Sequence, residues 1–236
     1  FWAHGDSGNE PKLVAFDATG KILAEVFVSG APNTDWEDIC ADNDGNLYIG
    51  DIGNNYAMFP ARYVYRVAEP DPFHPPAKPI PVAKRWRFKY PDKKRFDCES
   101  LFWHDGSLYV IANVTPTQAA IYRLTEVSEG QAKLERIIVP NIAFPTGADV
   151  SHDGKRLVIC SYSATWMFDL GMFDLGKGDG SQITLSNRRM VRYPMGQGAI
   201  ESVCFSGQDV VVMAENGNLY RFGPKDFEDQ TRFARP

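Results

Sequence analysis

Four segments of the chain share one pattern of apolar and polar positions. Each has an acidic residue near its start, then an alternating apolar run, a turn that contains Gly, and a strongly apolar run. The four segments are 35–51, 97–113, 147–163 and 199–216. Three of the turns contain the Asp-Gly pair that is typical of tight β-hairpins. Each segment therefore predicts two antiparallel strands joined by a hairpin.

Shorter runs of alternating polarity follow these hairpins and predict further strands. Third strands are expected at 62–67, 120–124, 165–170 and 218–223, and fourth strands at 83–91 and 134–140. The N-terminus fits the same order from a second strand onward, because its FWAHGD aligns with the later LYIGD. The phrase Gly-Asp-x-Gly-Asn, at 5–9 and again at 50–54, then marks the end of the second strand in two successive units.

Four-stranded units that repeat at this spacing are typical of β-propeller blades. We predict an all-β protein with a single propeller domain over residues 1–236. Five blades are favoured, and a six-bladed ring or a β-sandwich are the alternatives. The first blade is expected to lack its innermost strand, and the run 227–236 is a candidate to complete the last blade. The Pro-rich stretch 69–84 predicts an extended surface insertion within the second blade.

Composition and charge narrow the possible functions. The net charge of −5 and the single short basic run at 91–96 argue against nucleic-acid binding. No apolar run has the length that a membrane span needs. The four cysteines lack the paired spacing of a zinc ribbon, so they predict buried small apolar residues, with one disulfide left open. The chain starts without Met inside an apolar run, from which we expect further residues upstream. We expect a monomer.

The propeller arrangement predicts where polar residues gather. The start of each innermost strand and the end of each second strand meet at one mouth of the central channel. The alignment places one acid from each full unit there, which we predict as metal ligands: Glu37, Glu99, Asp149 and Glu201. Neighbouring positions predict ligand-binding residues: Asp6, Asn9, Asp38, Asp51, Asn54, Asn113, Tyr162 and Glu215. Catalytic candidates are His4, Glu37 and Glu99.

A ring of carboxylates cannot stay ionised without compensation, because like charges repel and raise each other's pKa. A divalent cation would neutralise the ring, and hard oxygen ligands suit Ca²⁺ better than Zn²⁺. Simpler interpretations stay open. Asp6 and Asp51 can be turn caps, since Asp, Gly and Asn are common turn residues. The aligned acids can accept hydrogen bonds from backbone amides of neighbouring blades, and His4 can be a structural histidine. His104 and His152, in hairpin turns, are expected to be solvated.

Several phrases at these positions resemble a family of bacterial, often exported, β-propeller proteins of uncharacterised function. The phrases are HGDSGN, DWEDIC, GDIGNN, CESLF, TGADVSHDGKRLVICSY and GAIESV, so the resemblance spans nearly all of the chain. In the family the first three read approximately HNDSG, DWEDIA and GDIGDN. The positions that match the family motifs include Asp35 as well as the acids named above. At Gly5 this chain has glycine where the family pattern has a polar residue. The resemblance implies a periplasmic or secreted protein. More distantly, the chain is similar to calcium-dependent lactonase and esterase propellers and to esterase-like phytase propellers.

Three classes of function remain after this reading. The favoured one is a metal-centred small-molecule site, and a hydrolase of that kind would act on an ester, a lactone or a phosphoester. A glycan-active propeller would use two of the channel carboxylates. A non-catalytic binding or scaffold propeller would keep the acids for structure alone. The sequence leaves open whether the protein is an enzyme.

Overall fold

The computed structural model describes residues 1–91, 94–115, 117–173, 182–193, 196 and 198–230. Almost all regular structure in this part of the chain is β-strand, and its one short helix is η2 (Pro224–Asp226). No helix among these residues has the length and apolar character to cross a bilayer.

The strands form antiparallel groups that follow one another around a central axis. The first group contains β1 (Trp2–His4), β2 (Lys12–Phe16) and β3 (Ile22–Ser29). The second group contains β4 (Trp36–Ala41), β5 (Asn46–Asp51), β6 (Arg62–Ala68) and β8 (Lys84–Phe88). In the first group, β1, β2 and β3 stand in the order that the sequence predicted for the second to fourth strands.

The third group contains β9 (Asp97–His104), β10 (Ser107–Thr115), β11 (Gln118–Ser128) and β12 (Gln131–Ile138). The fourth contains β13 (Pro145–Val150), β14 (Arg156–Ser161), β15 (Ala164–Phe173) and β16 (Gln182–Arg192). The fifth contains β17 (Ile200–Ser206), β18 (Asp209–Ala214) and β19 (Leu219–Phe222). One parallel bridge between β8 and β12 joins the second and third groups into an eight-stranded sheet.

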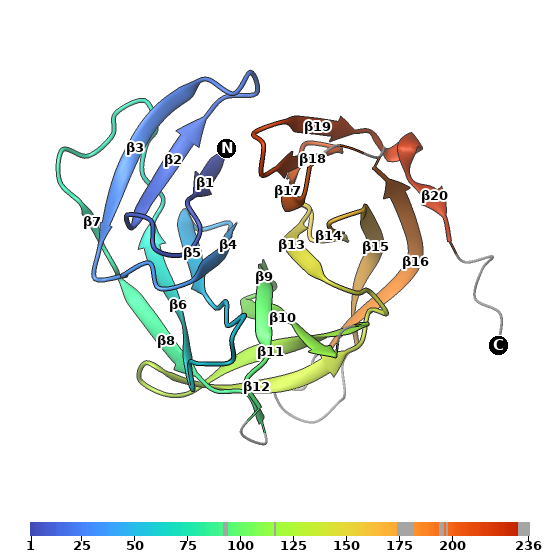
Figure 1. The fold of residues 1–236 in the computed structure, drawn as a ribbon, viewed down its shortest axis with the longest axis horizontal. Helices are drawn as coiled ribbons and strands as arrows, with labels where there is room; N and C mark the ends of the chain where they lie inside the picture. Colours follow the sequence, from blue (N-terminus) through green and yellow to red (C-terminus); the bar gives the residue numbers. More distant parts are fainter. Residues whose placement is uncertain (92–93, 116, 174–181, 194–195, 197, 231–236) are drawn as a thin grey trace.

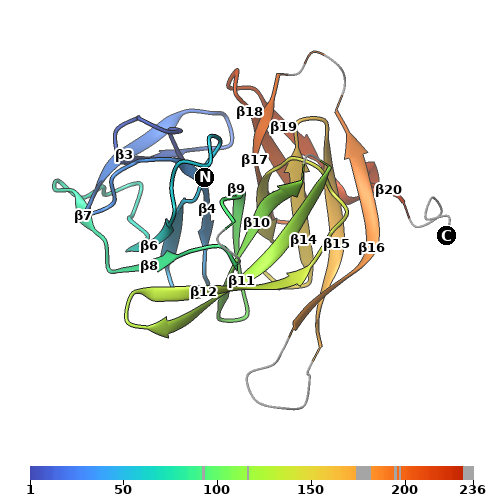
Figure 2. The same ribbon diagram turned by 60° about the horizontal axis from the view of Figure 1, so that its bottom comes forward.

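This arrangement is a β-propeller. Figure 1 shows β4, β9, β13 and β17 close to the centre, with β3, β8, β12 and β16 at the periphery. The view in Figure 2 shows β15 and β16 reaching beyond the other strands at one end. No strand pairing joins β19 of the fifth group to β1 of the first group among the described residues. The choice between five and six blades therefore stays a prediction.

Buried apolar side chains hold consecutive groups together. One cluster around Trp36 and Leu13 joins the first group to the second. Three more clusters, around Phe88, Phe102 and Val203, join the second to the third, the third to the fourth and the fourth to the fifth. Each strand supplies these side chains at alternate positions, which is the period-2 pattern that the sequence shows.

The structure changes two details of the predicted organisation. The Pro-rich stretch 69–84 contains the two-residue strand β7 (Ile80–Pro81), which pairs in parallel with β3 of the first group. The C-terminal run does not complete the last group in its described part. Its strand β20 (Glu228–Asp229) pairs with β16 of the fourth group, and residues 231–236 lie outside the described residues.

All four cysteines are free thiols, and three of them are buried. The prediction of small apolar residues is therefore confirmed for Cys40, Cys98 and Cys160, while Cys204 is only partly buried.

Candidate functional site

Each central strand of the four complete units carries a β-bulge near its start. The strand register skips one residue in each of β4, β9, β13 and β17, and the skipped residues are Glu37, Glu99, Thr146 and Glu201. A bulge leaves its extra residue unpaired and redirects its side chain. Three of the four predicted metal ligands thus occupy structurally equivalent bulges.

The predicted equivalence of Asp149 is wrong. The bulge residue of β13 is Thr146, and Asp149 lies three residues further along the same strand. In β13, Thr146 therefore stands where Glu37, Glu99 and Glu201 stand in the other central strands. Thr146 is buried, and its hydroxyl donates to the Ile200 carbonyl at 2.7 Å, so it ties β13 to β17.

Asp38 and Asp149 connect central strands to one another. The Asp38 carboxylate accepts backbone N–H groups from Leu101 in β9 at 2.8 Å, from Ala148 in β13 at 3.2 Å and from Ile39 at 2.9 Å. Asp149 accepts the N–H of Phe205 in β17 and that of Val150, both at 2.8 Å. Burial raises the pKa of both carboxyls, to about 6 for Asp149. Both residues therefore act as ties between blades, which was the alternative left open above.

Three other carboxylates converge at the mouth of the channel where β4 begins. Oxygens of Asp6, Asp35 and Glu37 lie within 4.8 Å of one another, and no other group of acids, histidines or cysteines in the described part of the chain meets this geometry. Asp6 comes from the loop after β1, Asp35 from the loop before β4, and Glu37 from the bulge of β4. We call these three residues the acidic triad.

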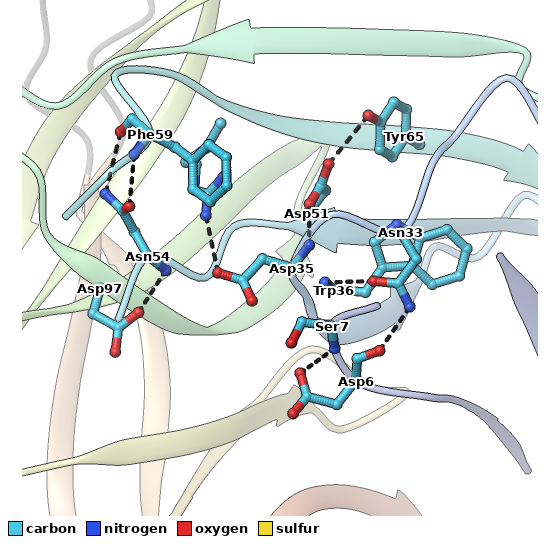
Figure 3. A network of polar contacts seen from close by, with 11 residues as sticks. Asp6, Ser7, Asn33, Asp35, Trp36, Asp51, Asn54, Phe59, Tyr65 and Asp97 are labelled. Atoms are coloured by element: carbon cyan, nitrogen blue, oxygen red, sulfur yellow. Dashed lines mark hydrogen bonds and ion pairs between the residues drawn. The ribbon is translucent and has the colours of Figure 1, made fainter. Parts of the chain in front are cut away.

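The backbone around Asp35 is fixed by the second Gly-Asp-x-Gly-Asn phrase. The Asp51 carboxylate accepts the Asp35 N–H at 2.8 Å and the Tyr65 hydroxyl at 3.3 Å (Figure 3). The Asp35 carbonyl accepts the N–H groups of Ile52 at 3.1 Å and Gly53 at 3.2 Å. Asp51 is therefore a buried brace beneath the acidic triad.

A buried arginine balances part of the negative charge. Nη2 of Arg62 lies 3.1 Å from Oδ2 of Asp35, and its guanidinium stacks over the Phe59 ring at 4.4 Å. Only 4% of the Arg62 side chain is exposed. Burial nevertheless raises the pKa of Asp35, and the charge of Arg62 opposes that rise. Arg62 was not predicted as a site residue, because no sequence pattern marks a single Arg in an outer strand as the partner of a buried carboxylate.

Asp6 is held by the turn formed by the first phrase. Its carboxylate accepts the Ser7 N–H, and its carbonyl accepts the side-chain amides of Asn9 at 3.0 Å and Asn33 at 2.9 Å. Asn33 in turn accepts the Trp36 N–H at 3.1 Å (Figure 3). Asp6 therefore has the turn contacts expected of a cap, yet its exposed carboxylate also faces Asp35 and Glu37.

Glu37 and Glu99, from adjacent central strands, hydrogen-bond each other through their carboxyl groups. Burial raises the pKa of Glu37 to about 8, and burial with the nearby charge of Glu37 raises that of Glu99 to about 11. Asp97 lies close enough to Glu99 to contribute to this rise. Between them the pair retains at least one proton at neutral pH.

The loop after β5 is fixed by the Asn of the second phrase. The Asn54 N–H donates to Asp97 at 2.7 Å, and its side-chain amide exchanges hydrogen bonds with the backbone of Phe59 at 3.0 and 3.2 Å (Figure 3). Opposite Asp97 in the strand register stands Asn113, whose Oδ1 is buried without a hydrogen-bond partner among the described residues. Asn113 thus offers a free oxygen acceptor on the same side of the third group.

The far side of the mouth carries Glu201, Glu215 and Tyr162. The pKa of Glu201 is raised to about 7 by burial and by the charges of Glu215 and Asp6. Tyr162 is 50% exposed, and burial together with the charges of Glu201 and Glu99 raises its pKa to about 12. Glu201, a predicted site residue of the fifth group, therefore lies near enough to the acidic triad for the charge of Asp6 to raise its pKa.

His4 has the surroundings of a structural histidine. Its ring meets Trp36 edge-on with centroids 5.6 Å apart, and it hydrogen-bonds the backbone of Gly5 and of Asp38. Burial lowers its pKa, so the ring is neutral at physiological pH. The catalytic assignment of His4 stays a prediction, and these contacts favour the structural alternative.

The fold and site together define a propeller with an acidic channel mouth. No family model matches the chain, and no curated protein matches it. Solved structures similar to it include the β-propeller domain of Myceliophthora thermophila Cps50 (Swd1), at 12% identity and a TM-score of 0.48, over 92% of this chain and 78% of that one.

Two further solved structures are similar at the same level. The Malassezia sympodialis allergen Mala s 1 is 11% identical with a TM-score of 0.48, over 89% of this chain and 86% of that one. Kluyveromyces lactis Hsv2p is 13% identical with a TM-score of 0.41, over 97% of this chain and 62% of that one. Identities this low carry no information about function.

Proposed function

We propose that the protein binds a divalent cation, Ca²⁺ above all, at the acidic triad, and that a small ester, lactone or phosphoester is held and hydrolysed at this mouth. The convergence of oxygens from Asp6, Asp35 and Glu37 within 4.8 Å carries the proposal. Carboxylate oxygens are the preferred ligands of Ca²⁺, which accepts flexible geometry. The proposed ligand set therefore keeps only Glu37 of the four ligands expected from sequence: it adds Asp6 and Asp35 and leaves out Glu99, Asp149 and Glu201.

The residues present fit such a cation. Three carboxylates with one partner arginine leave an excess of negative charge, and burial together with the neighbouring carboxylates raises the pKa of Asp35 and Glu37. Of the two oxygens of Asp35, Oδ2 contacts Arg62, while Oδ1 makes no hydrogen bond among the described residues. Bound Ca²⁺ would supply Lewis-acid polarisation of a carbonyl or phosphoryl oxygen.

Residues of the chain itself would supply the proton, orient the acidic triad and contact the substrate. Glu99 holds a proton at its carboxyl and lies beside Glu37, so it is the candidate proton donor to a leaving oxygen. Arg62 orients Asp35, and the Asp51 brace fixes the backbone of the loop that carries it. Tyr162, half-exposed at the far side, offers an aromatic face to the substrate.

The glycan-active alternative is less consistent with this geometry. Retaining glycosidases separate their two carboxyl groups by about 5–5.5 Å, and inverting enzymes separate them further. Glu37 and Glu99 instead hydrogen-bond each other directly. The scaffold alternative is favoured by Asp38 and Asp149, whose oxygens accept hydrogen bonds from backbone N–H groups.

Calorimetric titration of the metal-free protein with CaCl₂ tests the proposal. Wild type is expected to bind one Ca²⁺ and to release protons, since the carboxyls must ionise. Glu37→Gln and Asp6→Asn should weaken binding at least tenfold, while Glu10→Gln, at an exposed glutamate of the same loop, should not. Hydrolysis of a lactone and of a phosphoester is then assayed with and without Ca²⁺. Absence of Ca²⁺ binding would overturn the metal site, and binding without hydrolysis would leave a non-catalytic binding protein.

The family resemblance further leads us to propose a periplasmic or secreted location. Expression of the full-length gene in a bacterium, followed by separation of periplasm and cytoplasm, tests this. Recovery from the cytoplasm alone would contradict it.

A further inference from the structure

Two exposed aromatic side chains stand together at the channel mouth. Phe144 directly precedes β13 and Tyr162 directly follows β14, and these strands pair with Pro145 opposite Ser161. The centroids of the two rings are 6.5 Å apart, and the rings are tilted by 37° to each other. This end of the strand pair carries the bulge of β13, so both rings lie on the mouth side of the fourth group. We call Phe144 and Tyr162 the aromatic pair.

The aromatic pair lies close to the acids of the mouth. Burial, followed by the charges of Glu201 and Glu99, raises the pKa of the Tyr162 hydroxyl to about 12. The hydroxyl therefore keeps its proton at neutral pH and adds no negative charge to the mouth. The pair offers uncharged apolar surface beside carboxylates.

Both rings are left open where the same group buries others. Phe144 is 46% exposed and Tyr162 is 50% exposed. Trp166 and Phe168 of β15 are instead buried in the cluster between the third and fourth groups. Exposed aromatic rings provide a large apolar area and a stacking face for a ligand. The aromatic pair is thus a candidate contact surface at the mouth.

The backbone of Phe144 has a conformation that does not suit its residue type. Its φ is 50°, in the left-handed region that bulky side chains rarely adopt. The residue before a proline is also restricted toward extended conformations, and Pro145 follows directly. A turn alone would be formed at lower cost by Gly or Asn. The requirements of the turn therefore do not explain a phenylalanine at this position.

Neighbouring residues hold Phe144 in this conformation. Ile142 is 1% exposed, and its carbonyl accepts the Ala119 N–H at 3.0 Å. Pro145, on the other side, is buried as well. Strained backbone conformations persist where the surrounding structure fixes them, and they cluster at sites that bind ligands. The anchored loop turns the Phe144 ring outward, which indicates a contact that the fold itself does not make.

We propose that the aromatic pair determines substrate specificity at the mouth, by binding an uncharged aromatic group attached to the ester, lactone or phosphoester. This inference rests on the proposed function of the acidic triad and names the class of substrate on which it would act. The neighbouring carboxylates disfavour an anionic group at this position. A sugar ring would need several hydrogen-bonding partners, and the Tyr162 hydroxyl is the only polar side-chain group of the pair.

NMR titration of the metal-free protein with benzyl acetate, and with ethyl acetate as its non-aromatic counterpart, tests the proposal. Benzyl acetate should bind saturably and ethyl acetate at least tenfold more weakly. Tyr162→Ala and Phe144→Asn should each weaken benzyl acetate binding at least threefold, while Tyr162→Phe, which keeps the ring, should bind as wild type does. The matched control is Phe73→Ala, which removes an exposed ring of the Pro-rich stretch and should leave the affinity unchanged.

The melting temperature of Phe144→Asn separates a binding role from a structural one. Asn adopts the left-handed conformation readily, so the melting temperature should stay at or above that of wild type while binding falls. A lower melting temperature with unchanged benzyl acetate binding would show that Phe144 serves the fold, and it would overturn the proposal.

Hydrolysis of benzyl acetate by water to benzyl alcohol and acetate, measured with Ca²⁺, keeps this inference apart from the proposed function. Binding through the aromatic pair without hydrolysis would support the pair and reject the hydrolase. Hydrolysis with equal kcat/KM for benzyl acetate and ethyl acetate would support the hydrolase and overturn the pair. Absence of saturable benzyl acetate binding, or tighter binding of methyl glucoside, would overturn the pair as well.

Discussion

Gly53 lies directly against the Glu37 carboxylate. A Cβ at Gly53 would overlap Oε1 of Glu37 and would also crowd the carboxyl carbon of Asp35, which it would approach to 2.7 Å. Gly53 is the second glycine of Gly-Asp-x-Gly-Asn, and no positive φ explains it. The phrase therefore needs glycine here because two acids of the triad occupy the space of a side chain.

Gly53→Ala is expected to displace Glu37 and Asp35 and to weaken Ca²⁺ binding at least tenfold. The overpacking should also cost about 1–3 kcal/mol of unfolding free energy. Gly223→Ala is the matched control, because a Cβ there meets only ordinary contacts at 3.7 Å. Calorimetry and denaturant unfolding measure the two effects. Wild-type Ca²⁺ affinity in Gly53→Ala would contradict the assignment of Glu37 as a ligand.

We expect a large loss of stability when the Asp38 carboxylate is removed. Asp38→Ala leaves backbone N–H groups of β4, β9 and β13 without their acceptor. Each buried donor left unpaired costs about 1–3 kcal/mol, so we expect a loss of about 3 kcal/mol or more. Asp44→Ala, at an exposed turn position, should stay within about 0.5 kcal/mol. Denaturant unfolding measures both, and a small effect in Asp38→Ala would show that the three-strand tie is not important for stability.

Stability of the metal-free protein should fall as pH rises from about 4.5 to about 8. The folded pKa values of Glu201, about 7, and Glu37, about 8, lie above their ordinary value. The folded state then binds more protons than the unfolded state in this window, so this contribution is full below about 4.5 and lost by about 8. Unfolding by denaturant across the pH range measures the slope. Glu37→Gln with Glu201→Gln should make the slope shallower but not flat, because Asp149 and Glu99 also have raised pKa values, and an unchanged slope in that variant would assign it to other groups.

The hairpin pattern of the sequence predicted most of the strands of the fold. Asp-Gly turns and period-2 alternation placed the strands of four units, since these signals act within a few residues. They did not show where 227–230 would pair, because β20 joins β16 through tertiary contacts of the fourth group. Likewise, nothing local distinguishes β7 from the rest of its Pro-rich stretch.

The site was predicted less completely than the fold. Glu37, Glu99 and Glu201 recur near the start of their sequence segments, and the structure places them in equivalent bulges of their strands. Asp149 was misplaced, although counting back from the Asp-Gly turn at 153–154 leads to Thr146, in line with the spacing of Glu37 and Glu99 from their own turns. Arg62 and Asp97 were not predicted as site residues, because their roles depend on contacts between segments that are distant in sequence. The expectation that His104 is a solvated turn residue is wrong, because only 8% of it is exposed.

The response of the melting temperature to Ca²⁺ separates the two ligand sets. A ligand that binds the folded state at a hundredfold excess over its dissociation constant stabilises that state by about 2.7 kcal/mol. For a chain of this length that corresponds to a rise of about 5–10 °C. Chelation with EDTA should reverse the rise. Asp6→Asn should abolish it, because Asp6 belongs to the acidic triad and not to the ligand set expected from sequence, whereas Asp149→Asn should keep it despite a lower starting temperature, because Asp149 ties β13 to β17 at the other end. Thermal unfolding followed by circular dichroism measures these shifts. A calcium response lost in Asp149→Asn and retained in Asp6→Asn would restore the ligand set expected from sequence and refute the triad.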